Sequence, residues 1–192
     1  STRSGNVVYL EDVLDKAVDK AYEIISDKSS DLDGAREIAE QVGVGAVIFG
    51  VLYNNRIKDM TFSYSRALNF DGETAPYVQY THARCCSLLE KCGAVDVEPD
   101  YKGIASEEAG EVIKLIDAYP QVLLSAAEKY EPCFVARFLV DLSQAFSRFY
   151  LACNINNAES RVKAARLMLV KAVKDILCGG LKLLGIGAPT KM

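Results

Sequence analysis

The sequence lacks any apolar run that reaches the roughly 18 residues needed to cross a bilayer. Its start, STRSGNVVY, also lacks the basic-then-apolar layout of a signal peptide. Blocks of low-complexity composition are missing, and glycine and proline contribute only 13 and 5 of the 192 residues. Half of the chain is hydrophobic, which is enough for a substantial core. We therefore expect a folded cytoplasmic protein with no membrane partner, and its polar start without methionine suggests a piece of a longer or processed chain.

Histidine and paired cysteines are also scarce. The chain has one histidine, His82, and none of its six cysteines forms a C-x-x-C pair. Structural zinc sites draw their ligands from such pairs and from histidines, so we expect no metal site. Three cysteines stand alone inside apolar helical patterns, which favours reduced thiols that pack as small hydrophobic side chains. The six are Cys85, Cys86, Cys92, Cys133, Cys153 and Cys178.

The net charge of −4 conceals an uneven distribution along the chain. Residues 1–130 carry 13 Lys and Arg against 22 Asp and Glu, whereas residues 131–192 carry 9 against 4. A basic segment on an acidic protein is more commonly a solvated helix face, but it can also bind a polyanion such as RNA. Charge alone leaves both interpretations open.

Apolar residues recur at helical spacing through most of the chain. One amphipathic helix follows Leu10, and a second begins near Ala35, where the glycines of QVGVGAVIFGVLYNN permit close packing on a neighbour. MTFSYSRALNFDGETAP is expected to be a short extended piece and a turn at Asp71 and Gly72, and then the start of a helix that Thr74 caps and that runs to about Lys91. After an aperiodic linker, we expect helices at about 106–118, 120–130, 132–153 and 158–184, and a non-helical tail at LGIGAPTKM.

The order of these elements predicts the fold class. Pro120 and Pro132 are each expected to open a helix, because proline is tolerated in the first turn. Five helices from residue 75 onward, with apolar faces and short connections, predict a mainly α protein in which residues 71–192 form a helical bundle. Residues 1–70 differ, since they start with the β-prone NVVYL and their helices have no evident packing partners.

The stretch YVQYTHARCC, on the first helix of this bundle, is the strongest candidate for a binding surface. Tyr77, Tyr80 and Arg84 fall at positions i, i+3 and i+7 and so share one helix face. Two aromatic rings and a guanidinium in this arrangement can stack on bases and pair with phosphates. The structural alternative is that the rings are buried at the rim of the bundle and that Arg84 pairs with an acid. In FSRFY, the spacing of Phe146, Phe149 and Tyr150 indicates core, although Tyr150 can reach the surface at the helix end.

Several motifs resemble, in order and over nearly the whole chain, those of the class I arginyl-tRNA synthetases. STRSGNVVYLEDVLDKA is similar to the segment that begins inside the second class I signature loop. FDGETAPYVQYTHAR is similar to the family's F-x-G-x-T-x-P-Y-x-Q-Y-x-H-A-R element, and it follows a run that resembles the stem-contact region. EPCFVARFLVDLSQAFSRFY, AARLMLVKAV and LKLLGIGAPTKM resemble the anticodon-binding bundle and its P-x-x-M terminus.

The resemblance implies a division of the chain and the loss of most catalytic motifs. Residues 1–70 would be the C-terminal, mostly helical part of a Rossmann-type catalytic domain with the stem-contact region, and 71–192 the anticodon-binding bundle. The family's HIGH signature would lie upstream, and only Ser1, Thr2 and Arg3 would remain of the KMSKS-type loop, with Arg3 as a candidate catalytic remnant. The parent enzyme would use ATP and Mg²⁺, whereas this piece alone would need no cofactor and would not activate arginine.

The resemblance also implies that the piece binds arginine tRNA, and not DNA. Tyr80 and Arg84 belong to the motif that faces the anticodon loop, and Tyr77 shares their helix face. Tyr150 and Met192 are similar in position to residues that contact anticodon bases, and Asn154 lies one turn beyond Tyr150. Basic side chains near the end of the chain would add a salt-sensitive attraction to phosphates, namely those of Arg161, Lys163, Arg166, Lys171 and Lys174.

Two other functions remain open on the sequence. One is a helical protein-interaction module that uses the bundle for assembly without RNA. The other is a piece that has no function of its own.

Overall fold

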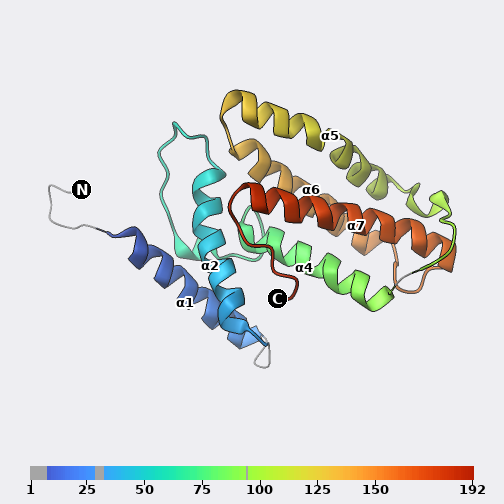
Figure 1. Ribbon diagram of the computed structural model, residues 1–192, viewed down its shortest axis with the longest axis horizontal. Coiled ribbons are helices and arrows are strands. Elements are labelled where there is room, and N and C mark those ends of the chain that lie inside the picture. The colour runs from blue at the N-terminus through green and yellow to red at the C-terminus, as the bar shows by residue number, and fades with distance from the viewer. Residues whose placement is uncertain (1–7, 29–32, 94) are drawn as a thin grey trace.

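The computed structural model describes residues 8–28, 33–93 and 95–192, which form helices and irregular segments and contain no β-strand. Figure 1 shows two helices at one side of the molecule and an elongated bundle beside them. The elements in chain order are α1 (Leu10–Lys28), α2 (Ala35–Leu52), α3 (Tyr64–Ala67), α4 (Ala75–Cys92), the 3₁₀ helix η2 (Tyr101–Ile104), α5 (Glu107–Lys129), α6 (Cys133–Ala152) and α7 (Ser160–Leu183). The mainly α fold predicted from the sequence is confirmed, and no described helix is long and apolar enough to span a membrane.

The two N-terminal helices pack closely on each other. A Cβ atom at Gly43 of α2 would lie 2.6 Å from the backbone of Val18 in α1, so only glycine allows this approach. Their shared apolar faces form a small cluster with one residue from the turn after α3: Ala21, Ile25, Ala39, Val42, Ala46 and Leu68. The close packing expected from the glycines of this segment is confirmed.

The larger core lies among the four helices of the bundle. α6 is the central helix, because more than half of its residues are buried, including Phe146 and Phe149, which are both fully buried. The predicted core role of these two phenylalanines is confirmed. Helix caps match local sequence signals: the Thr74 hydroxyl accepts the N–H of Tyr77 at the start of α4, and Ser106 does the same for α5.

One helix boundary was predicted wrongly. Pro120 does not open a helix but lies inside the continuous helix α5, so the described residues from Ala75 onward form four α-helices, not five. The apolar face of α5 continues across the proline, with Val112 buried before it and the Tyr119 ring stacked on Phe138 at 5.1 Å next to it. Packing on α6 therefore keeps the chain helical despite the missing N–H. Pro132, in contrast, immediately precedes α6 as expected.

The C-terminal tail leaves α7 and crosses back over α4 toward α2 (Figure 1). It is non-helical, as predicted. The side-chain amide of Gln79 in α4 donates to Gly187 O at 2.8 Å and to Gln41 O of α2 at 3.1 Å. His82 Nδ1 lies 2.9 Å from Pro189 O. These contacts place the last residues of the chain next to the middle of α4.

Two expectations near the N-terminus differ from the structure. Within the β-prone NVVYL, Val8 and Tyr9 are irregular and Leu10 begins α1, while the earlier residues lie outside the described part. The segment expected to be extended before Asp71 contains the short helix α3. In both places the neighbouring helices provide no strand with which an extended segment could pair.

Candidate nucleic-acid interface

A groove of about 400 Å³ opens where α4, the end of α6 and the C-terminal tail meet, and we call it the tail groove. It brings together four of the residues singled out in the sequence, which lie up to 112 positions apart: Tyr80, Arg84, Tyr150 and Met192. Four polar residues also line it: Ser87, Lys91, Asn156 and Lys191. The groove thus combines aromatic rings, an amide and three cations.

Arg84 lies at the centre of this constellation. Its guanidinium carbon is 4.9 Å from the centroid of the Tyr80 ring and 5.3 Å from that of the Tyr150 ring. Both distances are within the range of cation–π attraction. Arg84 makes no hydrogen bond or ion pair within the described residues. The alternative in which Arg84 pairs with an acidic side chain therefore finds no support in that part of the chain. Its N–H groups remain available for a phosphate or a base edge.

Met192 reaches the groove because the tail is anchored behind it. Gln79, which is fully buried, holds the tail at Gly187, and His82, 3% exposed, holds it at Pro189. Burial lowers the pKa of His82 by disfavouring the charged imidazolium. Met192 also packs against the α1–α2 cluster on its other side. The histidine of YVQYTHARCC therefore has a structural role.

Three predicted site residues are not in the tail groove. Tyr77 is half-buried, and its hydroxyl lies 3.4 Å from Ser147 Oγ of α6. At the start of α4, the helix face shared by Tyr77, Tyr80 and Arg84 therefore faces the bundle. Asn154 is exposed in the loop after α6, where it lines a neighbouring hollow. Arg3 lies outside the described residues.

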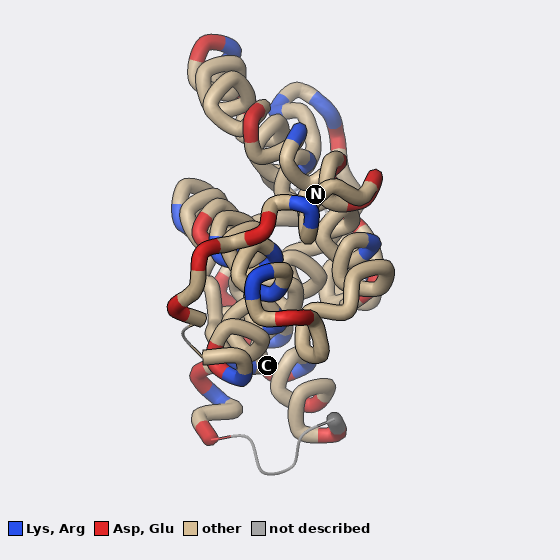
Figure 2. The backbone as a smooth tube through the Cα atoms, turned by 90° about the vertical axis from the view of Figure 1, so that its right-hand side faces the viewer, with Lys and Arg blue, Asp and Glu red and all other residues tan. Residues whose placement is uncertain are grey.

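The basic residues predicted to attract phosphates are partly occupied by other partners. Arg166 donates to Gly103 O at 3.0 Å and to Asn154 O at 2.7 Å, and Arg161 donates to Glu98 O at 3.2 Å. These two arginines hold η2 and the loops around it. Lys174 pairs with Asp175 at 2.8 Å. Figure 2 shows Lys and Arg interspersed with Asp and Glu over the molecule, not gathered on one patch.

Sequence reasoning missed Lys91, Lys191, Ser87 and Asn156. Lys91 follows Arg84 by seven positions, so helical spacing alone could have placed it on the same face. The other signals are weaker: Lys191 is adjacent to Met192, and Asn156 belongs to a loop that has no periodicity.

The cysteines and carboxylates form no alternative site. All six cysteines are free thiols, and burial raises the pKa of the Cys86 thiol, which lies 3.6 Å from His82 Nε2. The described residues contain no group of three or more His, Cys, Asp or Glu that could hold a metal ion.

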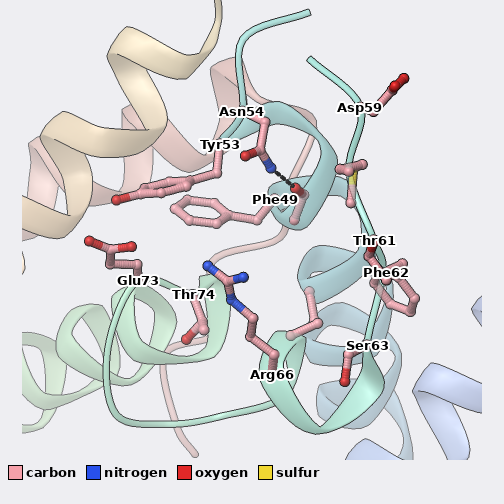
Figure 3. Close-up of a pocket in the computed structure, with 14 residues that line it drawn as sticks. Phe49, Tyr53, Asn54, Asp59, Thr61, Phe62, Ser63, Arg66, Glu73 and Thr74 are labelled. Carbon is pink, nitrogen blue, oxygen red and sulfur yellow. Dashed lines mark hydrogen bonds between the residues drawn. The ribbon is translucent and has the colours of Figure 1, made fainter.

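A second pocket, of about 320 Å³, lies between α2, α3 and the segment that joins them (Figure 3). Phe49 and Tyr53 form one wall with their rings stacked at 5.7 Å, and Arg66 points inward opposite Glu73 (Figure 3). Burial and the neighbouring Glu73 carboxylate raise the pKa of Tyr53 to about 12. The pocket contains none of the tRNA-binding residues named individually from the sequence, and its aromatic wall belongs to the junction between α2 and the bundle.

Two family models match successive parts of the chain. Residues 78–192 match the family model of the DALR anticodon binding domain, and residues 1–64 match that of tRNA synthetases class I (R), catalytic domain. Arginine–tRNA ligase of Clostridioides difficile is 50% identical over 193 residues, and that of Halothermothrix orenii is 48% identical over 193. Each match covers all of this chain but 34% of the relative, so the chain spans about a third of their length.

Solved structures give the same match. Arginyl-tRNA synthetase of Thermus thermophilus superposes with a TM-score of 0.92 at 33% identity, over 97% of this chain and 32% of that protein. The arginyl-tRNA synthetase of Plasmodium falciparum superposes with a TM-score of 0.83 at 24% identity, over 97% of this chain and 34% of that one, and supports the fold alone.

Proposed function

The chain belongs to the DALR anticodon-binding domain family, and from this premise we propose that it is the tRNA-binding part of an arginine–tRNA ligase. In the whole ligase, arginine would be activated with ATP and Mg²⁺ and joined to arginine tRNA in the cytoplasm. The chain spans about a third of the length of these relatives, and we assign tRNA binding to this part. We place the boundary between its two parts at residues 70 and 71, between the two matched segments.

We propose that the tail groove holds unpaired bases of the anticodon loop. The observation that carries this proposal is the position of Arg84, which lies over two tyrosine rings and makes no hydrogen bond or ion pair within the described chain. Bases in a single-stranded loop can stack on such rings, and each stacked base contributes roughly 1–3 kcal/mol. Lys91 and Lys191, both exposed at the groove, would pair with phosphates.

Binding by stacking and by phosphate pairing leads to a direct test. The 192-residue chain is titrated with the anticodon stem-loop of an arginine tRNA and with the same RNA in which the central anticodon base is changed. We expect tighter binding of the unchanged loop, and affinity for both that falls as salt rises. Equal binding of both RNAs at several salt concentrations would contradict anticodon recognition.

The residues are tested with a double substitution, Tyr80→Ala with Arg84→Ala. Loss of one stacking platform and its cation is expected to weaken RNA binding by roughly 10-fold to 100-fold. A matched control is Tyr22→Ala with Arg36→Ala, which removes another tyrosine with an arginine over its ring, at 5.6 Å, from α1 and α2 outside the groove. Circular dichroism checks that both variants fold. If the groove variant folds and binds RNA like the control, the interpretation as a protein-interaction module is favoured instead.

A further inference from the structure

The loop between α6 and α7 is anchored to the core beside the tail groove. Cys153 and Ile155 are buried, 6% and 2% exposed, and thus anchor the loop to the core. The backbone carbonyl of Asn154 accepts a hydrogen bond of 2.7 Å from Arg166 of α7. The alternation of buried and exposed positions leaves the side chains of Asn154 and Asn156 exposed.

Both exposed amides have a defined orientation. The backbone N–H of Asn157 donates to Asn154 Oδ1 at 3.1 Å, which an N–H can do only toward the amide oxygen. The Cys92 thiol donates to Asn156 Oδ1 at 3.4 Å, and sulfur is too weak an acceptor to favour the reverse orientation. The two NH₂ groups have no partner in the described part of the chain. Each asparagine thus presents an NH₂ group without a partner, while its oxygen already accepts one hydrogen bond.

The loop also borders a hollow of its own. This loop hollow, of about 320 Å³, is formed by residues 150–156. Tyr150 and Asn156 line both the loop hollow and the tail groove, so they lie between the two cavities. Asn154 lines the loop hollow only.

We propose that the loop hollow is a second nucleotide subsite, so that two consecutive unpaired bases lie on either side of Tyr150. Asn156 and Asn154 donate their NH₂ groups to acceptor atoms on the edges of the first and the second base. This inference rests on the proposed function. It adds the loop hollow as a binding site for a base, a base-contacting role for Asn156, and a preference for bases that present hydrogen-bond acceptors. The ligand is single-stranded RNA with at least two adjacent unpaired bases that present acceptors, such as the O2 and N3 atoms of cytosine or the O6 atom of guanine.

Aspartate substitutions test the two donors, because Asp keeps the accepting oxygen and replaces NH₂ with a second acceptor. Asn156→Asp and Asn154→Asp are compared with Asn157→Asp, which makes the same charge change in the same loop but lines neither cavity. The probe is the anticodon stem-loop of an arginine tRNA. Loss of a donor and repulsion of the base acceptor are expected to weaken binding about 10-fold at each site, against less than about 3-fold for the control.

Abasic nucleotides then locate the partner bases. One loop nucleotide at a time is made abasic, and each variant is titrated with each RNA as a double-mutant cycle. We expect the effect of Asn156→Asp to vanish at one abasic position and that of Asn154→Asp to vanish at the adjacent position. Loss of both effects at the same position would overturn the two-base arrangement.

If all three aspartate variants weaken binding by the same factor, only charge repulsion acts and the subsite is absent. If none weakens binding while the Tyr80 and Arg84 substitutions do, the second subsite fails and the proposed function stands. If the unchanged chain does not bind the stem-loop, both proposals fail together.

Discussion

Residues of the segment QYTHAR divide into two sets that face opposite sides of α4. Gln79 and His82 point inward and hold the tail, whereas Tyr80 and Arg84 line the groove. The spacing of each set, three or four positions, is that of one helix face. One short segment therefore both lines the groove and holds the tail. This explains why it contains buried polar side chains as well as an exposed aromatic one.

His82 should make stability depend on pH. Burial lowers its pKa below the ordinary value of about 6.5, so between those two values the unfolded chain binds more protons. The stabilisation is fully present above about pH 6.5 and is lost as the pH falls toward the lowered pKa. Urea unfolding at about pH 7.5 and about pH 5.5 measures this difference, and we expect lower stability at the acid pH.

The matched variant for this prediction is His82→Asn, whose amide can donate to Pro189 O from about the position of Nδ1. It does not titrate, so we expect a smaller difference between the two pH values. The same difference in both proteins would show that groups other than His82 cause it.

At the scale of elements, close helix packing depends on a few glycines. A Cβ atom at Gly180 of α7 would lie 2.5 Å from a methyl carbon of Leu139 in α6, and one at Gly43 would meet the backbone of α1. A leucine side chain can shift, but a backbone cannot without moving its helix. Gly43 is therefore the stricter position, and it fixes the distance between α1 and α2.

Gly43→Ala is expected to lower the free energy of unfolding by about 1–3 kcal/mol, because α1 and α2 must separate to admit the methyl group. Gly50→Ala is the control in the same helix, since its nearest neighbour would be Phe62 at 3.9 Å. Alanine has the higher helix propensity, so the control should be neutral or slightly stabilising. Urea unfolding measures both, and equal losses would contradict the close approach.

At the scale of the whole molecule, the first and last parts of the chain are joined around α4. Gln79 contacts α2 and the tail at once, and Met192 lies between the groove and the α1–α2 cluster. A second junction lies at the other end of α2, where Arg56 donates to the carbonyls of Lys129 and Tyr130 at 2.9 Å each. The N-terminal part therefore does not simply adjoin the bundle but helps to shape the tail groove.

Gln79→Met tests whether the hydrogen bonds of Gln79, and not only its packing, hold the tail on α4. The methionine keeps the volume of the side chain but cannot donate to Gly187 O or Gln41 O, so the tail loses one of its two anchors. We expect faster hydrogen exchange in residues 186–192 and weaker binding of the anticodon stem-loop. Gln121→Met, at an exposed position of α5, is the control. Unchanged exchange in the tail would show that His82 alone holds it.

The sequence by itself determined the helices, most of their ends and the face shared by Tyr80 and Arg84. These features follow from periodicity and caps within a few residues of one another, so they can be predicted without knowing the fold. Only the tertiary structure decided that Pro120 stays within a helix, that Tyr77 contacts Ser147 outside the groove, and that Met192 returns to α4. Each of these depends on contacts between residues far apart in the chain, whose packing energy overrides or supplements the local preferences on which sequence patterns rest.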